Sequence, residues 1–256
     1  MPIPSILRRL NSFVLSLPEV VANGRRFRVR FILPRWFKMP ASVRVAGQQV
    51  ALRHPREEGV EADFISCFLR NTYGLGHKLG EVKTIIDVGA NVGFFALAAR
   101  DHYREAVIHA YEPNPRIQPE FRENTSGLNI QIFPEAVGSA DGYVSLVDTG
   151  PSDQARTRES QGPDGIIPQA GLQTVVDRIG GRVDLLKLDC EGAEWKILQS
   201  NQSWDSIRNI RLEYHLVDGK SRPDAIDALL EAGYEIVYSP QPTEHGGIVW
   251  AARRKD

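Results

Sequence analysis

The chain has 256 residues, of which 42% are hydrophobic and 25% charged, an ordinary composition for a soluble globular protein with a sizeable core. The two cysteines, Cys67 and Cys190, are too few for a disulfide framework and favour a reducing compartment. No apolar run approaches the roughly 20 residues that span a bilayer, and no signal peptide is evident. We therefore expect a cytoplasmic protein.

The net charge of −1 hides an uneven distribution of charge along the chain. Residues 1–56 carry eleven basic side chains and one acid, whereas the remainder is acidic. A basic arm of this kind indicates an anionic neighbour: a phosphorylated substrate, a membrane surface, a nucleic acid or the acidic body itself. Within the arm, Arg26, Arg28 and Arg30 alternate with apolar residues, as in a half-exposed strand, and we expect them to contact the anionic group.

Three more elements are expected before residue 80. Residues 4–16 have a helical pattern, and residues 42–52 read as a hairpin that turns near Gly47. Residues 61–73 predict a helix with apolar side chains on one face. We assign residues 1–80 to a basic N-terminal extension that contacts the acceptor or a second copy of the chain in a homo-oligomer.

Strands and helices alternate from residue 82 onward. The expected strands are 82–89, 106–113, 129–137, 143–148, 183–189, 207–215, 234–239 and 246–252. The expected helices are 92–103, 115–124, 193–200 and 223–233, with Pro115 in the first turn of the second. Apolar strands alternating with helices predict a doubly wound α/β domain over residues 81–256, whose ligands bind at the carboxyl ends of the strands. The polar segment 148–165 is expected to be a mobile lid or a surface loop.

The segment IIDVGANVGFF contains a glycine-rich turn between a strand and a helix. Glycine allows a sharp turn and a close approach to a ligand, while the helix N-terminus offers N–H groups. The pattern is G-x-x-x-G and departs from the G-x-G-x-x-G of nicotinamide dinucleotide sites. Asp87 would repel a diphosphate but suits S-adenosylmethionine, which carries a sulfonium and an ammonium group. Glu112, at the end of the next strand, is placed to bind both ribose hydroxyls.

Four segments resemble successive motifs of the FkbM family of S-adenosylmethionine-dependent methyltransferases: IIDVGANVGFFALAA, YEPNP, PEAVGS and DLLKLDCEGAEWKIL. The resemblance implies a seven-stranded, mostly parallel, Rossmann-like class I methyltransferase sheet whose last strand is antiparallel. It also implies methyl transfer to a hydroxyl oxygen, often of a sugar or a polyketide-like natural product. The cofactor-binding residues expected from these motifs are Asp87, Gly89, Ala90, Asn91, Gly93, Phe94, Glu112, Pro113, Asn114, Glu135, Ala136 and Val137.

Charged residues cluster at the end of the strand 183–189. Asp189 is the expected catalytic residue, because a carboxylate near an alcohol can take its proton during attack. Glu191 and Lys187 share its face if the segment is extended, and the lysine can then hold Asp189 ionised. His215, at the end of the next strand, is a second candidate base, with Asp189 orienting it. Glu194 is expected to favour the start of its helix.

Hard cations bind oxygen ligands, yet no spacing here enforces a metal site at Asp189, Glu191 and Glu213, so we expect no metal. The sequence DCEG stands where N-methyltransferases often carry [N/D]-P-P-[Y/F], which favours oxygen as the acceptor atom. The leading interpretation is an S-adenosylmethionine-dependent O-methyltransferase acting on a small molecule. The alternatives are an RNA or other anionic-substrate methyltransferase recruited by the basic arm, a nicotinamide oxidoreductase, and an inactive interaction module.

Overall fold

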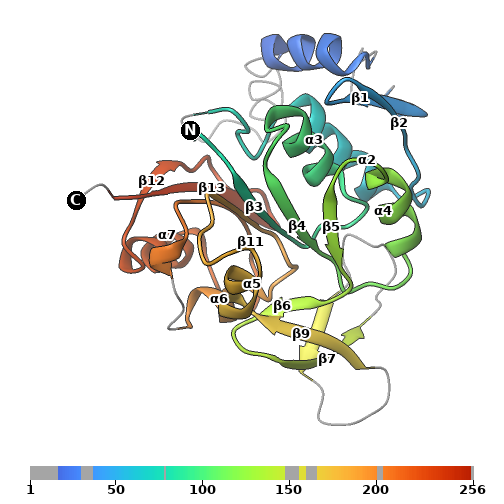
Figure 1. Cartoon of the computed structure of the whole chain (residues 1–256). Coiled ribbons are helices and arrows are strands. Elements are labelled where there is room, and N and C mark those ends of the chain that lie inside the picture. Colours follow the sequence, from blue (N-terminus) through green and yellow to red (C-terminus); the bar gives the residue numbers. More distant parts are fainter. Residues whose placement is uncertain are drawn as a thin grey trace.

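The computed structural model describes residues 17–29, 37–77, 79–147, 156–159, 166–200 and 204–254 (Figure 1). Residues 17–27 form a first helix. The other elements, in chain order, are β1 (Ser42–Val45), β2 (Gln48–Ala51), α2 (Glu58–Phe64), η2 (Ile65–Leu69), β3 (Thr84–Val88), α3 (Phe94–His102), β4 (Val107–Tyr111), α4 (Gln118–Thr125), β5 (Ile130–Phe133), β6 (Ala136–Gly138), β7 (Gly142–Val147), β8 (Arg156–Glu159), β9 (Ile166–Gly171), α5 (Leu172–Arg178), β10 (Leu185–Leu188), α6 (Glu194–Leu198), η4 (Trp204–Ser206), β11 (Asn209–His215), α7 (Arg222–Glu231), β12 (Tyr234–Tyr238) and β13 (Gly246–Arg253).

The large sheet has seven strands in the order β12-β13-β11-β10-β3-β4-β5. Its pairs from β11 to β5 are parallel, whereas β13 is antiparallel to both β11 and β12. The expected strand 129–137 is divided, because β5 joins this sheet and β6 leaves it. This arrangement confirms the predicted doubly wound, mostly parallel sheet with its reversed last strand.

Helices cover both faces of the sheet, as the alternation of buried side chains requires. Ile85 packs with the first helix, α2, α3 and α4, whereas the adjacent Ile86 packs with α5, α6 and α7. Successive strand residues point to opposite faces, so an unbroken apolar run such as the one in β3 serves both layers. The carboxyl ends of β3, β4, β10 and β11 therefore meet at one edge between two helical layers (Figure 1).

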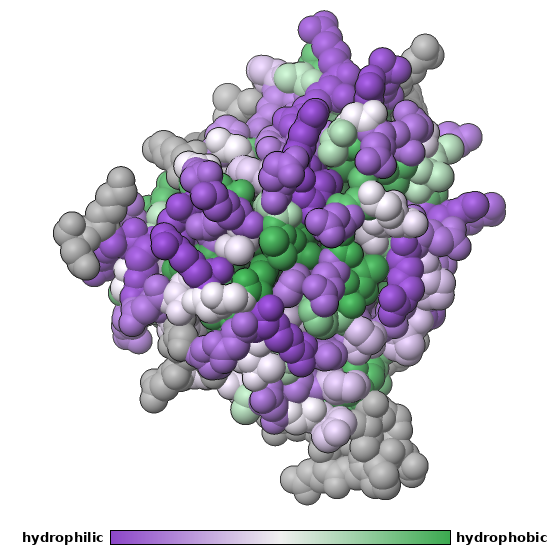
Figure 2. All heavy atoms as spheres, in the orientation of Figure 1, coloured by the Kyte–Doolittle hydropathy of each residue, from purple (hydrophilic) through white to green (hydrophobic). Residues whose placement is uncertain are grey.

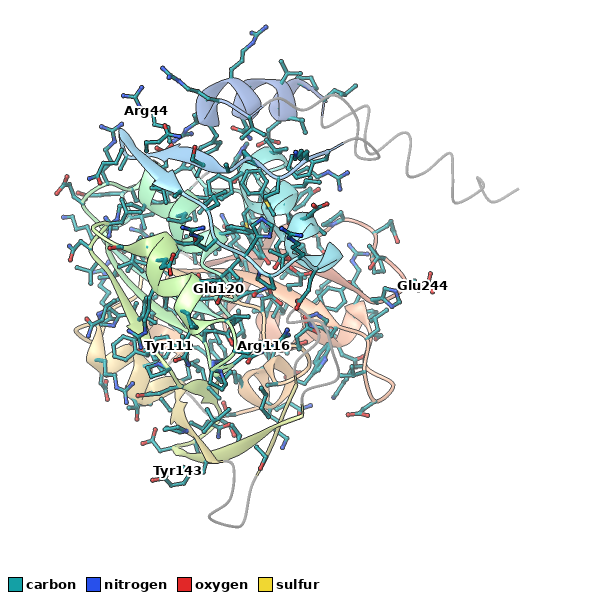
Figure 3. The ribbon with its side chains drawn as sticks, turned by 90° about the vertical axis from the view of Figure 1, so that its right-hand side faces the viewer. Arg44, Tyr111, Arg116, Glu120, Tyr143 and Glu244 are labelled. Atoms are coloured by element: carbon teal, nitrogen blue, oxygen red, sulfur yellow. The ribbon has the colours of Figure 1, made fainter. Side chains whose placement is uncertain are left out.

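A second sheet of four strands, in the order β6-β9-β7-β8, lies beside the carboxyl end of the first (Figure 1). Strand β9 and helix α5 were missed in the sequence. Within the expected lid 148–165, residues 156–159 form β8 and pair antiparallel with β7. Tyr143 of β7 is 59% exposed and projects from this sheet, at the opposite end of the molecule from Arg44 of the β1–β2 hairpin (Figure 3).

The N-terminal residues are packed into the same core as the sheet. The hairpin at Gly47 and the apolar face of residues 61–69 are confirmed, although the helix changes to π geometry at Ile65. Phe64, Phe68 and Phe94 contact one another, which joins α2 and η2 to α3. Residues before 80 thus contribute to the wall of the domain and share its core.

Three local expectations need correction or fall outside the described residues. The strand predicted around Arg26 and Arg28 is wrong, because the first helix continues to residue 27 and Arg28 forms a turn with φ 58°. The helix expected at 115–124 begins at Gln118, so Pro119 and not Pro115 occupies its first turn. Arg30 and the helix expected at 4–16 lie outside the described residues. No helix among the described residues has the length and hydropathy needed to cross a membrane.

Candidate active site

A cavity opens at the carboxyl edge of the large sheet. In Figure 2, hydrophobic residues gather near the middle of the face, inside a border of hydrophilic ones. The residues that line the cavity come from α2, η2, the glycine-rich turn and the ends of four strands: Gly59, Ala62, Asp63, Cys67, Tyr73, Val88, Gly89, Ala90, Asn91, Val92, Phe94, Phe95, Tyr111, Glu112, Pro113, Ala136, Val137, Leu146, Lys187, Asp189, Cys190, Glu191, Ala193 and Glu213.

The glycine-rich turn after β3 is held tightly against the end of β10. Gly89 has φ 73°, and a Cβ there would lie 1.7 Å from the carbonyl oxygen of Asp189, so glycine is required. The amide of Gly89 donates to Tyr111 at 3.1 Å, and its carbonyl accepts from Lys187 Nζ at 2.6 Å. The turn therefore packs the expected cofactor loop against the backbone of Asp189, the expected catalytic residue.

Glu112 ends β4 at the other side of this turn. One of its carboxylate oxygens accepts from the amide of Asn91 and the other from the amide of Asn114, both at 2.8 Å. A carboxylate has about four acceptor positions, so two remain for hydroxyl groups. Burial raises the pKa of Glu112 to about 7, against the effect of the two amides. The expected role of Glu112 at the ribose is compatible with these contacts and stays a prediction.

The remaining expected cofactor residues divide into those that line the cavity and those behind it. Ala136 and Val137 line it, whereas Glu135 pairs with Arg178 at 2.6 Å. The lining does not include Gly93 or Asn114: Gly93 is the N-cap of α3, and Asn114 supports Glu112.

Asp87 lies behind the wall of the cavity. Its side chain is fully buried and does not line the cavity, and Lys187 Nζ lies 3.3 Å from its carboxylate. The two residues are register partners on the parallel strands β3 and β10, so their side chains stand side by side. Asp87 therefore pairs with a lysine inside the sheet edge, and its expected contact with the cofactor stays a prediction.

Asp189 follows β10, and two groups contact its Oδ2 atom. Lys187 Nζ is 3.2 Å from Oδ2, and the hydroxyl of Tyr73 is 3.1 Å from the same atom. The Tyr73 hydroxyl also donates to Glu213 at 2.7 Å. Burial lowers the pKa of Lys187, but Asp189 and Asp87 outweigh it and raise that pKa above its ordinary value. Lys187 is therefore a permanent cation beside Asp189.

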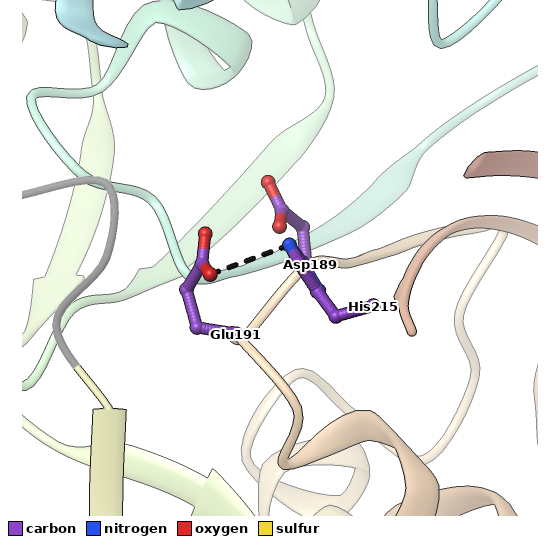
Figure 4. Close-up of side chains that lie close together, drawn as sticks. All are labelled: Asp189, Glu191 and His215. Atoms are coloured by element: carbon purple, nitrogen blue, oxygen red, sulfur yellow. Dashed lines mark ion pairs between the residues drawn. The ribbon is translucent and has the colours of Figure 1, made fainter. Parts of the chain in front are cut away.

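His215 is held between two glutamates, of which Figure 4 shows Glu191. Its Nε2 lies 3.4 Å from Glu191, and its Nδ1 lies 3.0 Å from the fully buried Glu194, which also accepts from the His215 amide. Burial lowers the pKa of His215, but Glu191 and Glu194 outweigh it and raise the pKa to about 11. A protonated imidazole cannot accept a proton, which argues against His215 as the base. Glu194, not Asp189, orients the ring.

Glu191 lines the cavity, but its backbone is not extended as expected. The extended backbone assumed for residues 187–191 ends before it, because Glu191 has φ 54°. Asp189, Glu191 and His215 each offer one atom within 4.8 Å of the others, a spacing that a cation could bridge. The expected absence of a metal at this edge stays a prediction.

Among the cavity residues that were not predicted from the sequence are Asp63, Cys67 and Tyr73. All three precede the sheet, and Tyr73 is 116 residues from Asp189 along the chain. Cys67 was expected on the apolar face of its helix and is buried there. No local spacing could have linked Asp63 and Tyr73 to the strand ends, because the link is made by the packing of α2 and η2 against α3.

The arginine arm is partly engaged within the chain. Arg26 Nε lies 2.7 Å from Asp101 at the end of α3, and the same carboxylate accepts from the amide of Ala46. The anionic partner of Arg26 is therefore an acid of the chain itself, Asp101. Arg28 is exposed.

The strand order, the glycine-rich turn and the acidic residue after β4 define a class I S-adenosylmethionine-dependent methyltransferase. The family model of the methyltransferase FkbM domain matches residues 87–236, more than half of the chain. The chain belongs to this family, and S-adenosylmethionine is its cofactor. The oxidoreductase alternative is thereby removed.

Relatives and solved structures extend the comparison. Methyltransferase sdnD of Sordaria araneosa is 27% identical over 220 residues, which cover 69% of this chain and 83% of the relative. The 31-O-demethyl-FK506 methyltransferase FkbM of Streptomyces tacrolimicus is 26% identical over 227 residues, which cover 73% and 85%. The crystal structure of methyltransferase FkbM from Methylobacillus flagellatus KT aligns with a TM-score of 0.47 and 13% identity, over 67% of this chain and 44% of that one.

Proposed function

We propose that this methyltransferase acts on a hydroxyl oxygen of a small-molecule acceptor, a sugar or another natural-product or glycan intermediate. The observation that carries the proposal is the position of Asp189 in the cavity, at the end of β10 and against the glycine-rich turn. An alcohol is a poor nucleophile, and a carboxylate within hydrogen-bond reach assists it by taking its proton. S-adenosylmethionine, when bound, supplies an electrophilic methyl group on a sulfonium.

The neighbours of Asp189 suit it for this role. Both described partners of its carboxylate, Lys187 and Tyr73, contact Oδ2, so Oδ1 is the atom for the acceptor's proton. Lys187 contacts the carboxylate at 3.2 Å and is itself fixed by the carbonyl of Gly89. One ammonium group thus sets the distance between the base and the cofactor turn, which positions the reactants.

The residues that would hold the cofactor fit its chemistry. Glu112 has acceptor positions left for ribose hydroxyls, and Ala136 and Val137 offer an apolar surface beside it for a purine. Five carboxyl groups line the cavity: Asp63, Glu112, Asp189, Glu191 and Glu213. Lys187 is the one lysine or arginine in that lining, so the cavity suits a cationic ligand.

A polar acceptor is supported by a second pocket that shares Glu191 and Ala193 with the cavity. Its lining includes Ser139, Gln169, Lys196 and Asp218, side chains that bind hydroxyl groups. The name of the relative from Streptomyces tacrolimicus gives an O-demethyl compound as its substrate, which also supports oxygen.

The alternative, an RNA or other anionic acceptor recruited by the arm, is less well supported. The carboxylates of the cavity repel phosphate, and Arg26 is paired with Asp101. If Arg26, Arg28 and Arg30 nevertheless bind an anionic acceptor, replacing all three with Gln raises its KM in a salt-dependent way while cofactor affinity stays the same. An acceptor KM unchanged by the triple substitution would leave the arm a structural role.

The proposal is tested by incubating the protein with S-adenosylmethionine labelled in its methyl group and a panel of hydroxylated compounds, each with its amino analogue. NMR of the product shows whether the label is attached to oxygen or nitrogen. We expect labelled oxygen and, because we propose a reaction without a metal, we expect EDTA to leave the rate unchanged. Label on nitrogen or on RNA contradicts the proposal. Restoration of an EDTA-treated enzyme by Mg²⁺ contradicts the metal-independent mechanism.

A further inference from the structure

Asp63 is a cavity carboxylate that comes from outside the residues matched by the family. It lies one residue before the end of α2, and the family match begins at residue 87. Its Oδ2 accepts from the side-chain amide of Asn91 at 2.9 Å. Asn91 is in the glycine-rich turn with φ 48°, so α2 is attached directly to the loop that surrounds the cofactor site.

The charge of Asp63 is not balanced by a contacting cation. No lysine, arginine or histidine in the described part of the chain lies within 4.0 Å of its carboxylate, because Lys187 is engaged by Asp87 and Asp189. Burial raises the pKa of Asp63 well above its ordinary value, and Asp189 and Glu213 raise it further. A buried carboxylate in this position gains most from a ligand that brings a positive charge.

Asn91 places Asp63 relative to the expected ribose site. The backbone amide of Asn91 donates to Glu112, whereas its side-chain amide donates to Asp63. The two carboxylates therefore lie on either side of one residue. With Glu112 at the ribose and Ala136 and Val137 at the purine, Asp63 lies toward the amino-acid end of the cofactor.

We propose that Asp63 binds the ammonium group at the amino-acid end of S-adenosylmethionine. It takes the role that the sequence suggested for Asp87, which Lys187 already neutralises. The inference rests on the cofactor of the family and on Glu112 as the ribose residue; it is independent of the acceptor and of Asp189 as the base.

The test compares two ligands by calorimetry, with no acceptor present. S-adenosylhomocysteine carries the ammonium group, whereas 5′-methylthioadenosine has the purine, ribose and sulfur but lacks the whole amino-acid end. Asp63→Asn keeps the shape and the contact with Asn91 while removing the charge. Glu61→Gln, at an exposed position of the same helix, is the matched control.

We expect Asp63→Asn to weaken the affinity for S-adenosylhomocysteine by about 10- to 100-fold, the loss typical of a charge-assisted hydrogen bond. The affinity for 5′-methylthioadenosine should change by less than about twofold. Glu61→Gln should leave both affinities unchanged. Equal weakening of both ligands would show that Asp63 only shapes the turn, and unchanged affinity for S-adenosylhomocysteine would show that it binds nothing. Either result overturns the inference, while the proposed O-methylation would still stand. Thermal denaturation of Asp63→Asn confirms that the variant is folded.

Discussion

Lys187 lies between Asp87 and Asp189, with Nζ 3.3 Å from the first carboxylate and 3.2 Å from the second. Asp87 is fully buried behind the cavity, whereas Asp189 lines it. One ammonium group therefore contacts both an acid of the core and the candidate base.

This relationship predicts the effect of removing the lysine on stability. Lys187→Met leaves Asp87 buried beside no cation and should lower the free energy of unfolding by about 3–5 kcal/mol. The pKa of Asp87, already raised by burial, should rise further without Lys187. Because a raised carboxyl pKa makes the folded state bind more protons than the unfolded state, the unfolding free energy lost in Lys187→Met should grow as pH rises. Urea denaturation from about pH 5 to about pH 8 measures it.

Lys83→Met is the matched control for that experiment. Lys83 pairs with Glu81 at 3.2 Å, but the lysine side chain is 71% exposed, so we expect a change of less than about 1 kcal/mol. Two results would show that Asp87 does not depend on Lys187. The first is a loss of unfolding free energy in Lys187→Met as small as that of the control, and the second is a loss that shrinks as pH rises.

The hydroxyl of Tyr73 should affect the pH dependence of the reaction. Burial and the charge of Asp189 raise the pKa of Glu213 to about 7, although the hydrogen bond from Tyr73 lowers it. Tyr73→Phe should therefore move the limb of the kcat profile near pH 7 toward higher pH and lower kcat by about 10-fold. The affinity for S-adenosylhomocysteine should change little. An unshifted profile would mean that Glu213 does not titrate in the reaction.

Cofactor binding should depend on the ionisation of Glu112. Its pKa of about 7 means that the carboxylate, the stronger acceptor for ribose hydroxyls, forms as pH rises through neutrality. Affinity for S-adenosylhomocysteine should increase from about pH 6 to about pH 8. Glu112→Gln should weaken binding by about 2 kcal/mol and flatten this profile. Calorimetry that finds the same slope in the variant would assign the titration to another group.

The sheet and the glycine-rich turn could be predicted from the sequence because their signals are local. The apolar run before Gly89 identifies β3, and the charged residues after Leu188 mark the end of β10. The second sheet was not predicted, because the polar segment before Ile166 hid the strand that follows it. The roles of Asp87 and Tyr73 depend on strand register and on contacts between distant segments, which no local pattern records.

Glu194 shows the same limit in a single residue. Its place at the start of α6 suggested an interaction with the helix dipole. The structure places it in that first turn and also buries it completely, where it accepts from the amides of Gly192 and His215. The function of a buried acid is determined by the donors around it, and one of these, the amide of His215, comes from a strand 21 residues away along the chain.

The measurement that most directly tests the proposed chemistry is the turnover of Asp189→Asn. The substitution keeps the shape of the side chain but removes its basicity, so kcat should fall by roughly 10²–10⁴ while the affinity for S-adenosylhomocysteine stays within about threefold of the original. A folded Asp189→Asn protein that retains most of its turnover would contradict the account. The positioning of acceptor and cofactor would then suffice for methyl transfer without a base at this position.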